Sequence, residues 1–360
     1  MQLESHPCKL HLSIFQVIPK IGLQPQAGLQ ELVSKASTLF VKSKNRVSTK
    51  VDIFLMFKTT SCDLPILAPY RENMFIPAAI VNTLTSNLSH SEKMTFFLSL
   101  LNEIEQWSLC AISNFQVGIL GIDDQNNCYF GVNAEFPNTP IHTTIHSEQF
   151  LVSNVFKHGI STSLEHLFLK AAPCGHCRQF LSETVGSNTM ITVFHDEIHE
   201  TRELKNLLPF SFGPMDLGVN QSLLQQERDY EKKITNSQLE QATIWANENA
   251  IRQMAVEAAA TKAFAPFSGV HEGCVLVCEN GEICVGSSIE SAAFNPSLMS
   301  VQVAIIDVYR KGIALDSIVS ATIVSMRPSV GKGPNFEKFG KMLLVSAGCM
   351  KEEDIEFVTF

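Results

Sequence analysis

The chain has 360 residues, of which 45% are hydrophobic and 18% charged, and its formal net charge is −9. This length suffices for two domains that bury cores, and no run approaches the roughly 18 apolar residues of a membrane-spanning helix. The acidic balance argues against nucleic acid as the main partner, because Lys and Arg supply phosphate binding. We expect a globular protein with no membrane partner.

The first sixty residues are basic, with eight Lys or Arg and three Asp or Glu. Transit peptides are rich in Arg and poor in acidic residues, but Arg46 is the only Arg here, and Glu4 and Glu31 interrupt the segment. No charged segment followed by an apolar run indicates a secretory signal. We therefore expect a cytosolic location, with organellar targeting left open, and reduced cysteines.

The hydrophobic spacing predicts a helix over residues 26–38 and another over residues 92–107. Residues 39–109 are otherwise irregular. From residue 113 the pattern becomes regular. It predicts strands over residues 117–122, 128–132, 166–171 and 190–194, and helices over residues 145–156 and 174–184. Strands that alternate with helices indicate an α/β layer architecture.

A second copy of this pattern follows the first at an offset of 155 residues, which carries Gly131 to Gly286 and Glu135 to Glu290. Between the copies, Gly213-Pro214 ends the first unit, residues 225–233 resemble a charged linker, and residues 237–264 favour one long helix. The second copy predicts strands over residues 274–278, 283–286 and 318–326 and helices over residues 301–309 and 336–345.

The chemistry concentrates in the first copy, where His146 and Glu148 are followed by Cys174 and Cys177. One imidazole and two thiolates suit zinc, and three protein ligands leave the fourth position open, as in catalytic sites. The two cysteines lie three residues apart at a predicted helix N-terminus, where the helix dipole favours thiolates. Glu148 is placed to carry protons in a hydrolysis.

A Cys-x-x-Cys pair alone is compatible with a structural zinc knuckle or a redox pair. The order H-x-E followed by P-C-x-x-C is instead the signature of zinc deaminases. We leave His142 and His176 outside the ligand set, as surface or supporting residues.

The longer motifs resemble the cytidine deaminase family, in its long, two-copy, homodimeric zinc type, and the plant members most. The matching stretches are residues 113–115, 131–136, 145–149, 172–180 and 212–217. The resemblance covers residues 111–360, with a weaker match near residues 26–38. It implies two tandem three-layer α/β/α units, the second degenerate. It divides the chain into an N-terminal region (1–110), a catalytic domain (111–218), a linker and helix (219–264) and a non-catalytic domain (265–360).

The resemblance also implies roles for individual residues. His146, Cys174 and Cys177 would hold one zinc per chain, and Glu148 would be the catalytic proton carrier. Substrate binding would fall to residues that contact the ribose or the base, namely Asn133, Glu135, Phe115 and Phe212, the last of which would close the neighbouring subunit's site. Asn133 and Glu135 could instead only cap a turn, and Phe115 could be a core residue.

The second copy has Val301 and Val303 at the offset positions of His146 and Glu148, and its Cys349 stands alone. We expect this copy to be a scaffold. Two features of the chain depart from the family: Ser147 stands where alanine is usual, and residues 39–109 resemble an insertion or a gene-model error.

The expected function is hydrolytic deamination of cytidine and 2′-deoxycytidine in pyrimidine salvage, by a homodimer. A deaminase acting on RNA or DNA, a deoxycytidylate deaminase, and a weakly active protein with a binding role are the alternatives. The acidic charge opposes the first, and no cation near Asn133 supplies the phosphate clamp that the second needs.

Overall fold

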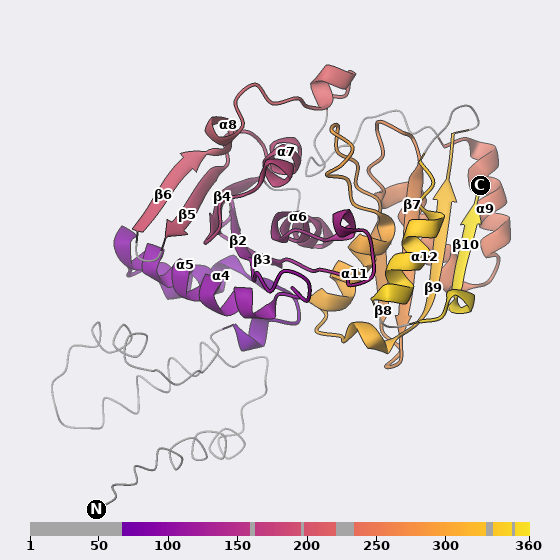
Figure 1. Cartoon of the computed structure of the whole chain (residues 1–360), viewed down its shortest axis with the longest axis horizontal. Coiled ribbons are helices and arrows are strands. Elements are labelled where there is room, and N and C mark those ends of the chain that lie inside the picture. Colours follow the sequence, from indigo (N-terminus) through magenta and orange to yellow (C-terminus); the bar gives the residue numbers. More distant parts are fainter. Residues whose placement is uncertain (1–66, 159–162, 196–197, 221–233, 329–333, 348–349) are drawn as a thin grey trace, which may run out of the picture. The chain divides into compact units, whose positions relative to one another are not determined.

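The computed structural model describes residues 67–158, 163–195, 198–220, 234–328, 334–347 and 350–360. All of them belong to one unit, Pro65–Phe360. The helix predicted over residues 26–38, the linker over residues 225–233 and Cys349 lie outside the described residues. Two β-sheets, each with its own helices, define a first and a second lobe (Figure 1). None of the described helices is long and apolar enough to cross a membrane.

The first lobe contains a six-stranded sheet in the order β1-β3-β2-β4-β5-β6. Its strands are β1 (Phe75–Ile76), β2 (Gly118–Asp123), β3 (Cys128–Val132), β4 (Leu164–Leu169), β5 (Met190–His195) and β6 (Ile198–Glu203). Its helices are α4 (Ala78–Thr85), α5 (His90–Ile104), α6 (Ser147–Lys157), α7 (Gly175–Thr184) and α8 (Leu204–Leu207). Strands β4 and β5 are parallel, and the other pairs are antiparallel.

The described part of residues 1–110 belongs to this lobe, although the sequence suggested a separate region. Strand β1 pairs with β3, and α5 packs against β2 and β4. The ring of Phe97 in α5 packs against that of Phe168 in β4, with 4.6 Å between the centroids and the ring planes tilted by 31°. The elements β1, α4, β6 and α8 were not predicted. Strand β6 is as long as β2, but its residues are mostly polar and exposed, so it lacks the apolar pattern of a buried strand.

The second lobe contains a four-stranded sheet in the order β10-β9-β7-β8. Its strands are β7 (His271–Cys278), β8 (Ile283–Ser287), β9 (Ile318–Met326) and β10 (Ile355–Thr359), and its helices are α9 (Asn236–Ala246), α10 (Ala250–Glu257), α11 (Ser300–Arg310) and α12 (Glu337–Ser346). Only β9 and β10 are parallel. This order repeats β5-β4-β2-β3 of the first lobe; the sequence predicted β7, β8 and β9 but not β10. Short 3₁₀-helices lie at Ala68–Tyr70, Glu105–Trp107, Ile141–Thr143, Pro214–Leu217, Leu315–Ser317 and Glu352–Asp354, and a single π-helical turn lies at Ala258–Lys262.

The single helix predicted over residues 237–264 is wrong. Asn247 has a positive φ of 42°, which ends α9, and the side chain of Asn249 caps α10 by accepting from the Arg252 N–H. Asparagine tolerates positive φ and is a preferred N-cap, so two asparagines in three residues divide the helix.

Glycine brings one helix close to the sheet in each lobe. A Cβ on Gly131 of β3 would collide with backbone atoms of Ser147 and Leu151 in α6, and one on Gly286 of β8 would collide with Ser300 and Ala304 in α11. Glycine is therefore required for this approach. The two helices thereby occupy equivalent places in the two lobes.

The equivalent helices correct the alignment of the two copies. Helices α6 and α11 have the same length, with His146 and Met299 as their N-caps. Their offset is therefore 153, and the connection before α11 is two residues shorter than the one before α6. Met299 and Val301, and not Val301 and Val303, correspond to His146 and Glu148. Neither offers the imidazole or the carboxylate of the first lobe.

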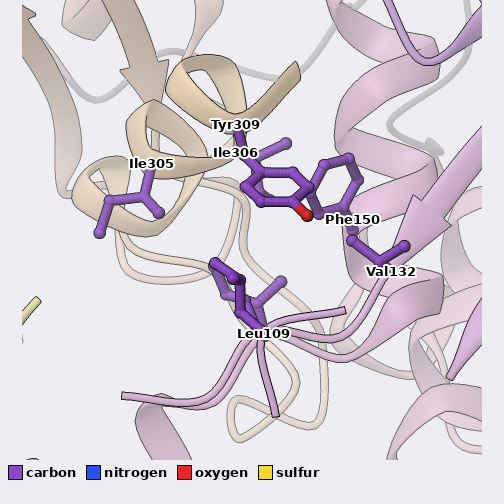
Figure 2. Close-up of a pocket in the computed structure, with 8 residues that line it drawn as sticks. Leu109, Val132, Phe150, Ile305, Ile306 and Tyr309 are labelled. Atoms are coloured by element: carbon purple, nitrogen blue, oxygen red, sulfur yellow. The ribbon is translucent and has the colours of Figure 1, made fainter. Parts of the chain in front are cut away.

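The two lobes meet where α6 packs against α11. Figure 2 shows apolar side chains from both sides of this contact, with the Phe150 ring beside that of Tyr309. Their centroids are 5.8 Å apart and the rings nearly perpendicular, a favourable edge-to-face arrangement. The lobes therefore share a continuous buried core.

Candidate active site

His146 lies at the N-terminus of α6, immediately before its first helical residue. Its backbone N–H donates to Oε1 of Gln149, three residues later, at 3.0 Å. This local bond satisfies one of the free N–H groups of a helix start. Because Gly131 lets α6 approach β3, the end of α6 that carries His146 lies close against the sheet.

Cys174 and Cys177 lie at the start of α7, with Cys174 as the N-cap. Cys177 is completely buried, whereas Cys174 is exposed. The Nδ1 atom of His146 is 3.7 Å from the Cys174 sulfur and 3.4 Å from the Cys177 sulfur. Two helix N-termini therefore converge on one point, as the sequence predicts.

The spacing of these atoms fits zinc. Zinc bonds of about 2.3 Å to sulfur and about 2.0 Å to nitrogen, at a tetrahedral angle, place the nitrogen and the sulfur about 3.5 Å apart. The observed distances of 3.7 and 3.4 Å bracket this value. All three ligand atoms lie within 4.8 Å of one another, and no other such cluster occurs among the described residues.

The electrostatics of the cluster favour a cation. Hydrogen bonding with Cys177 and His146 lowers the pKa of the Cys174 thiol to about 3, so this sulfur is a thiolate. Its hydrogen bond and charge raise the pKa of His146. His176, which the sequence left outside the ligand set, stacks on the His146 ring with 4.9 Å between the centroids. This stacking fixes the plane of the ligating imidazole.

Glu148 lies in the first turn of α6 and is 5% exposed. Its Oε2 accepts a hydrogen bond of 3.0 Å from the hydroxyl of Ser147. Its charge also contributes to the raised pKa of His146. Glu148 is thus a buried carboxylate beside the three ligands. Ser147, the departure from the family, contacts it directly.

Glu135 accepts three hydrogen bonds from the loop that carries Phe115. The donors are the Ile112 N–H and the Ser113 N–H, each at 2.8 Å, and the Ser113 hydroxyl at 2.5 Å. Partial burial works against ionisation, but the bonds from Ser113 and Ile112 hold the pKa of Glu135 below its ordinary value. The carboxylate therefore fixes the loop.

Asn133 holds the same loop from the neighbouring side. Its Oδ1 accepts from the Val117 N–H and its Nδ2 donates to the Phe115 carbonyl, each at 2.9 Å. The ring of Phe115 is 59% exposed, so the reading of Phe115 as a core residue is wrong. The loop presents this ring outward.

The second lobe repeats the arrangement. Glu290 accepts from the N–H groups of Phe267 and Ser268 and from the Ser268 hydroxyl, and Ser288 accepts from the Glu272 N–H. Loop fixing is thus common to both lobes and does not require a zinc site. Any contact of Asn133 and Glu135 with a substrate would be an additional role.

Phe212 is 45% exposed beside α7 of its own chain. Its carbonyl accepts from Nε2 of Gln179 at 2.6 Å, and the same amide donates to Oε1 of Glu183 at 2.5 Å. Sequence reasoning missed Gln149, Gln179 and Glu183. Of these three, only Gln149 has a sequence signal. It lies three residues after His146, the N-cap of α6, and glutamine at that position is typical of a capping box.

Two family models match the chain, at residues 91–193 and 204–332, and both are described as the cytidine and deoxycytidylate deaminase zinc-binding region. Cytidine deaminase from Proteus mirabilis is 33% identical over 268 residues, covering 73% of this chain and 85% of that protein. The chain belongs to the cytidine deaminase family. Cytidine deaminase 6 of Arabidopsis thaliana is 37% identical, over 56% of this chain and 71% of the relative.

Another member of this cytidine deaminase family, Cytidine deaminase 1 of Arabidopsis thaliana, is 34% identical over 64% of this chain and 81% of its own length. Among solved structures, cytidine deaminase from Mycobacterium tuberculosis is 27% identical, covering 31% of this chain and 91% of that one, with a TM-score of 0.28. The family matches and the His146, Cys174 and Cys177 cluster agree on zinc as the metal.

Proposed function

We propose that this chain hydrolyses cytidine and 2′-deoxycytidine to uridine and 2′-deoxyuridine, with release of ammonia. The observation that carries the proposal is the buried Glu148 beside three candidate ligands for one zinc ion, in a chain whose relatives are named cytidine deaminases. Bound zinc supplies a Lewis acid that makes a water molecule nucleophilic near neutral pH. Three protein ligands leave a position open for such chemistry.

Glu148 carries the protons. In the overall reaction a water oxygen bonds to C4 of the base, one proton goes to N3, another goes to the amino group, and the C–N bond breaks to release ammonia. A single carboxylate that accepts a proton and then gives it up serves each transfer. Glu148 suits this task because it lies beside the ligands without being one of the three.

The sugar would be bound by Asn133 and Glu135, and the base or sugar would pack on Phe115. The exposed ring of Phe115 and the fixed loop that presents it support this assignment. A carboxylate and an amide two residues apart in extended backbone face the same side, which suits the neighbouring hydroxyls of a ribose. This assignment predicts a nucleoside substrate and not the free base.

We also propose a homodimer that works in pyrimidine salvage in the cytosol. Four apolar side chains are exposed between residues 210 and 217: Phe210, Phe212, Met215 and Leu217. A second copy could cover them, and the family resemblance assigns Phe212 to the neighbouring subunit's site. Sedimentation of the zinc-loaded protein as twice the chain mass would support this part of the proposal.

The test of the activity is direct. The purified full-length chain is assayed for zinc and for the loss of cytidine absorbance, with free cytosine as the comparison substrate. We expect one zinc per chain, turnover of cytidine, and a much lower kcat/KM for cytosine. Two tightly bound metals per chain would contradict the single site, and equal efficiency on cytosine would contradict the nucleoside assignment.

A further inference from the structure

A loop of the second lobe, residues 291–297, lies between β8 and α11 and is closed by its own hydrogen bonds. The Ser291 N–H donates to the Ser297 hydroxyl at 3.0 Å, and the Phe294 N–H donates to the Ser291 carbonyl at 2.9 Å. Ser291 and Ala292 are almost fully buried. We refer to residues 291–297 as the brace, because the loop contacts both helices that carry zinc ligands.

The first contact reaches α6. The Pro296 carbonyl accepts from Nε2 of Gln149 at 2.9 Å. Oε1 of the same Gln149 accepts from the backbone N–H of His146 at 3.0 Å. Gln149 is only 2% exposed, so this side chain has no freedom to turn away. One amide therefore connects the backbone of a zinc ligand to the second lobe.

The second contact reaches α7. Glu183 is 7% exposed, and its Oε1 accepts from the Ser291 hydroxyl at 2.9 Å. Its Oε2 accepts from the Ala292 N–H at 2.6 Å. Oε1 also accepts from Gln179 at 2.5 Å. Three donors therefore converge on the two oxygens of this carboxyl group.

We propose that Gln149 and Glu183 are positioning residues through which the brace fixes the spacing of α6 and α7, and with it the spacing of His146 from Cys174 and Cys177. The ligands come from two separate helices, so a preformed zinc site requires that the helices be held together. The second lobe, which lacks ligands, thereby acts on the metal site of the first. The inference concerns zinc and goes beyond the proposed substrate.

The experiment measures the rate at which zinc leaves the full-length, zinc-loaded protein for an excess of a chromogenic chelator. Three variants remove a contact between the brace and one of the helices that carry zinc ligands. They are Gln149→Ala, Glu183→Gln and Ser291→Ala. Ser291→Ala leaves every charge and every ligand in place. Because loss of a residue that orients a ligand costs about 10–100-fold in metal affinity, we expect release to be faster by about 10-fold or more in each variant.

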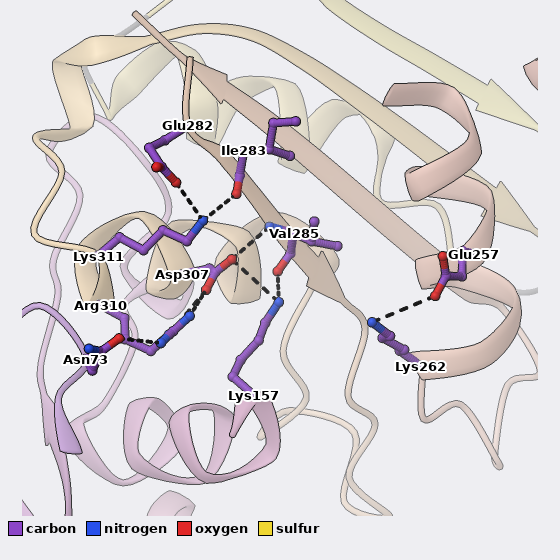
Figure 3. Close-up of polar contacts among 10 residues, drawn as sticks. All are labelled: Asn73, Lys157, Glu257, Lys262, Glu282, Ile283, Val285, Asp307, Arg310 and Lys311. Atoms are coloured by element: carbon purple, nitrogen blue, oxygen red, sulfur yellow. Dashed lines mark hydrogen bonds and ion pairs between the residues drawn. The ribbon is translucent and has the colours of Figure 1, made fainter. Parts of the chain in front are cut away.

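The control is Lys157→Met, which interrupts contact between the same helix and the same lobe at the other end of α6. Figure 3 shows Lys157 reaching the Val285 carbonyl and Asp307. The lysine Nζ is 3.7 Å from an oxygen of Asp307, which keeps its ion pair with Arg310 in the variant. We expect zinc release from this variant to stay within about twofold of the parent rate.

The outcomes are distinct. Fast release from the three brace variants, with parental release from Lys157→Met, supports the inference. Equal acceleration in Lys157→Met would show general loosening of the lobes and overturn it, as would parental release from Ser291→Ala and Glu183→Gln. Should Gln149→Ala fail to fold, the other two variants carry the test. A parent that releases zinc as expected but never deaminates cytidine would contradict only the proposed function.

Discussion

Gln149 and Gln302 hold equivalent positions in the two lobes and reach across the contact in opposite directions. Nε2 of Gln149 donates to the Pro296 carbonyl, and Nε2 of Gln302 donates to the Thr143 carbonyl, both at 2.9 Å. Oε1 of each glutamine also accepts from the backbone N–H of the residue just before its own helix. The donors are His146 at 3.0 Å and Met299 at 2.9 Å. The lobes differ in their catalytic residues but share these bonds.

This symmetry predicts equal losses of stability. Gln149→Ala and Gln302→Ala each remove one buried and one partly buried hydrogen bond, which contribute about 1 kcal/mol apiece. We expect each substitution to lower the free energy of unfolding by about 2–3 kcal/mol, measured by urea denaturation with zinc in excess. A loss of stability in Gln149→Ala but not in Gln302→Ala would show that the two glutamines do not contribute equally to stability.

Sequence reasoning succeeded where residue type dictates geometry. The Cys-x-x-Cys spacing at a helix start and the preceding H-x-E predicted the cluster that His146, Cys174 and Cys177 form. The period of the hydrophobic residues predicted both main helices of the first copy to within two residues. The internal repeat predicted three of the four strands of the second sheet, because the order of strands and helices is set by the same pattern.

The remaining features depend on contacts that are distant in sequence. Glu183 and Ser291 are 108 residues apart, so neither residue alone indicates their bond. The alignment of Val303 with Glu148 failed because the connection before α11 is two residues shorter, which no local pattern reveals. The loop-fixing role of Glu135 became distinct from its proposed substrate role only when Glu290 showed the same bonds.

That pair of glutamates yields a prediction about the substrate. Glu135→Gln should raise the KM for cytidine by about 5- to 150-fold, since losing a charged hydrogen-bond partner costs about 1–3 kcal/mol. Glu290→Gln is the matched control, because Glu290 fixes the equivalent loop of the lobe that lacks zinc. Steady-state kinetics should show a parental KM for this control. A parental KM in Glu135→Gln as well would contradict a contact between Glu135 and the substrate.

Glu272, in β7, is a buried carboxyl group that should make stability depend on pH. It accepts a hydrogen bond of 2.6 Å from the Ser300 hydroxyl, and burial raises its pKa to about 7. The folded protein therefore keeps this proton at a pH where the unfolded chain has lost it. The contribution is complete below about pH 4.5 and is lost as the pH rises toward 7.

The corresponding experiment compares the parent with Glu272→Gln by urea denaturation at pH 5 and pH 8. The raised pKa of Glu272 corresponds to about 3 kcal/mol of stability in the parent. The variant should lack this part of the pH dependence, because glutamine can accept the hydrogen bond from the Ser300 hydroxyl but does not titrate. We expect the variant to gain stability relative to the parent on going from pH 5 to pH 8. An identical pH dependence in both proteins would exclude Glu272 as its source.

The hydrogen bond from Ser147 to Glu148 can be removed without removing the Glu148 carboxylate. The Ser147 hydroxyl donates to Oε2 of Glu148 at 3.0 Å and is buried. Ser147→Ala removes this bond but leaves the carboxylate and all ligands, so we expect kcat for cytidine to change by less than about 10-fold, the scale of one hydrogen bond. A loss of several orders of magnitude would make the hydroxyl, and not the carboxylate alone, part of the proton path.

Glu148→Ala removes the carboxylate itself. General acid–base groups contribute about 10²–10⁴-fold, and because Glu148 is proposed to serve two proton transfers, we expect kcat to fall by at least the upper end of that range. His146, Cys174 and Cys177 remain, so zinc content by atomic absorption should stay at one per chain, and calorimetry should still detect cytidine binding. Loss of zinc together with turnover would make Glu148 a ligand or a structural residue. Retained turnover would place the proton carrier elsewhere, and the proposed deamination mechanism would have to be abandoned.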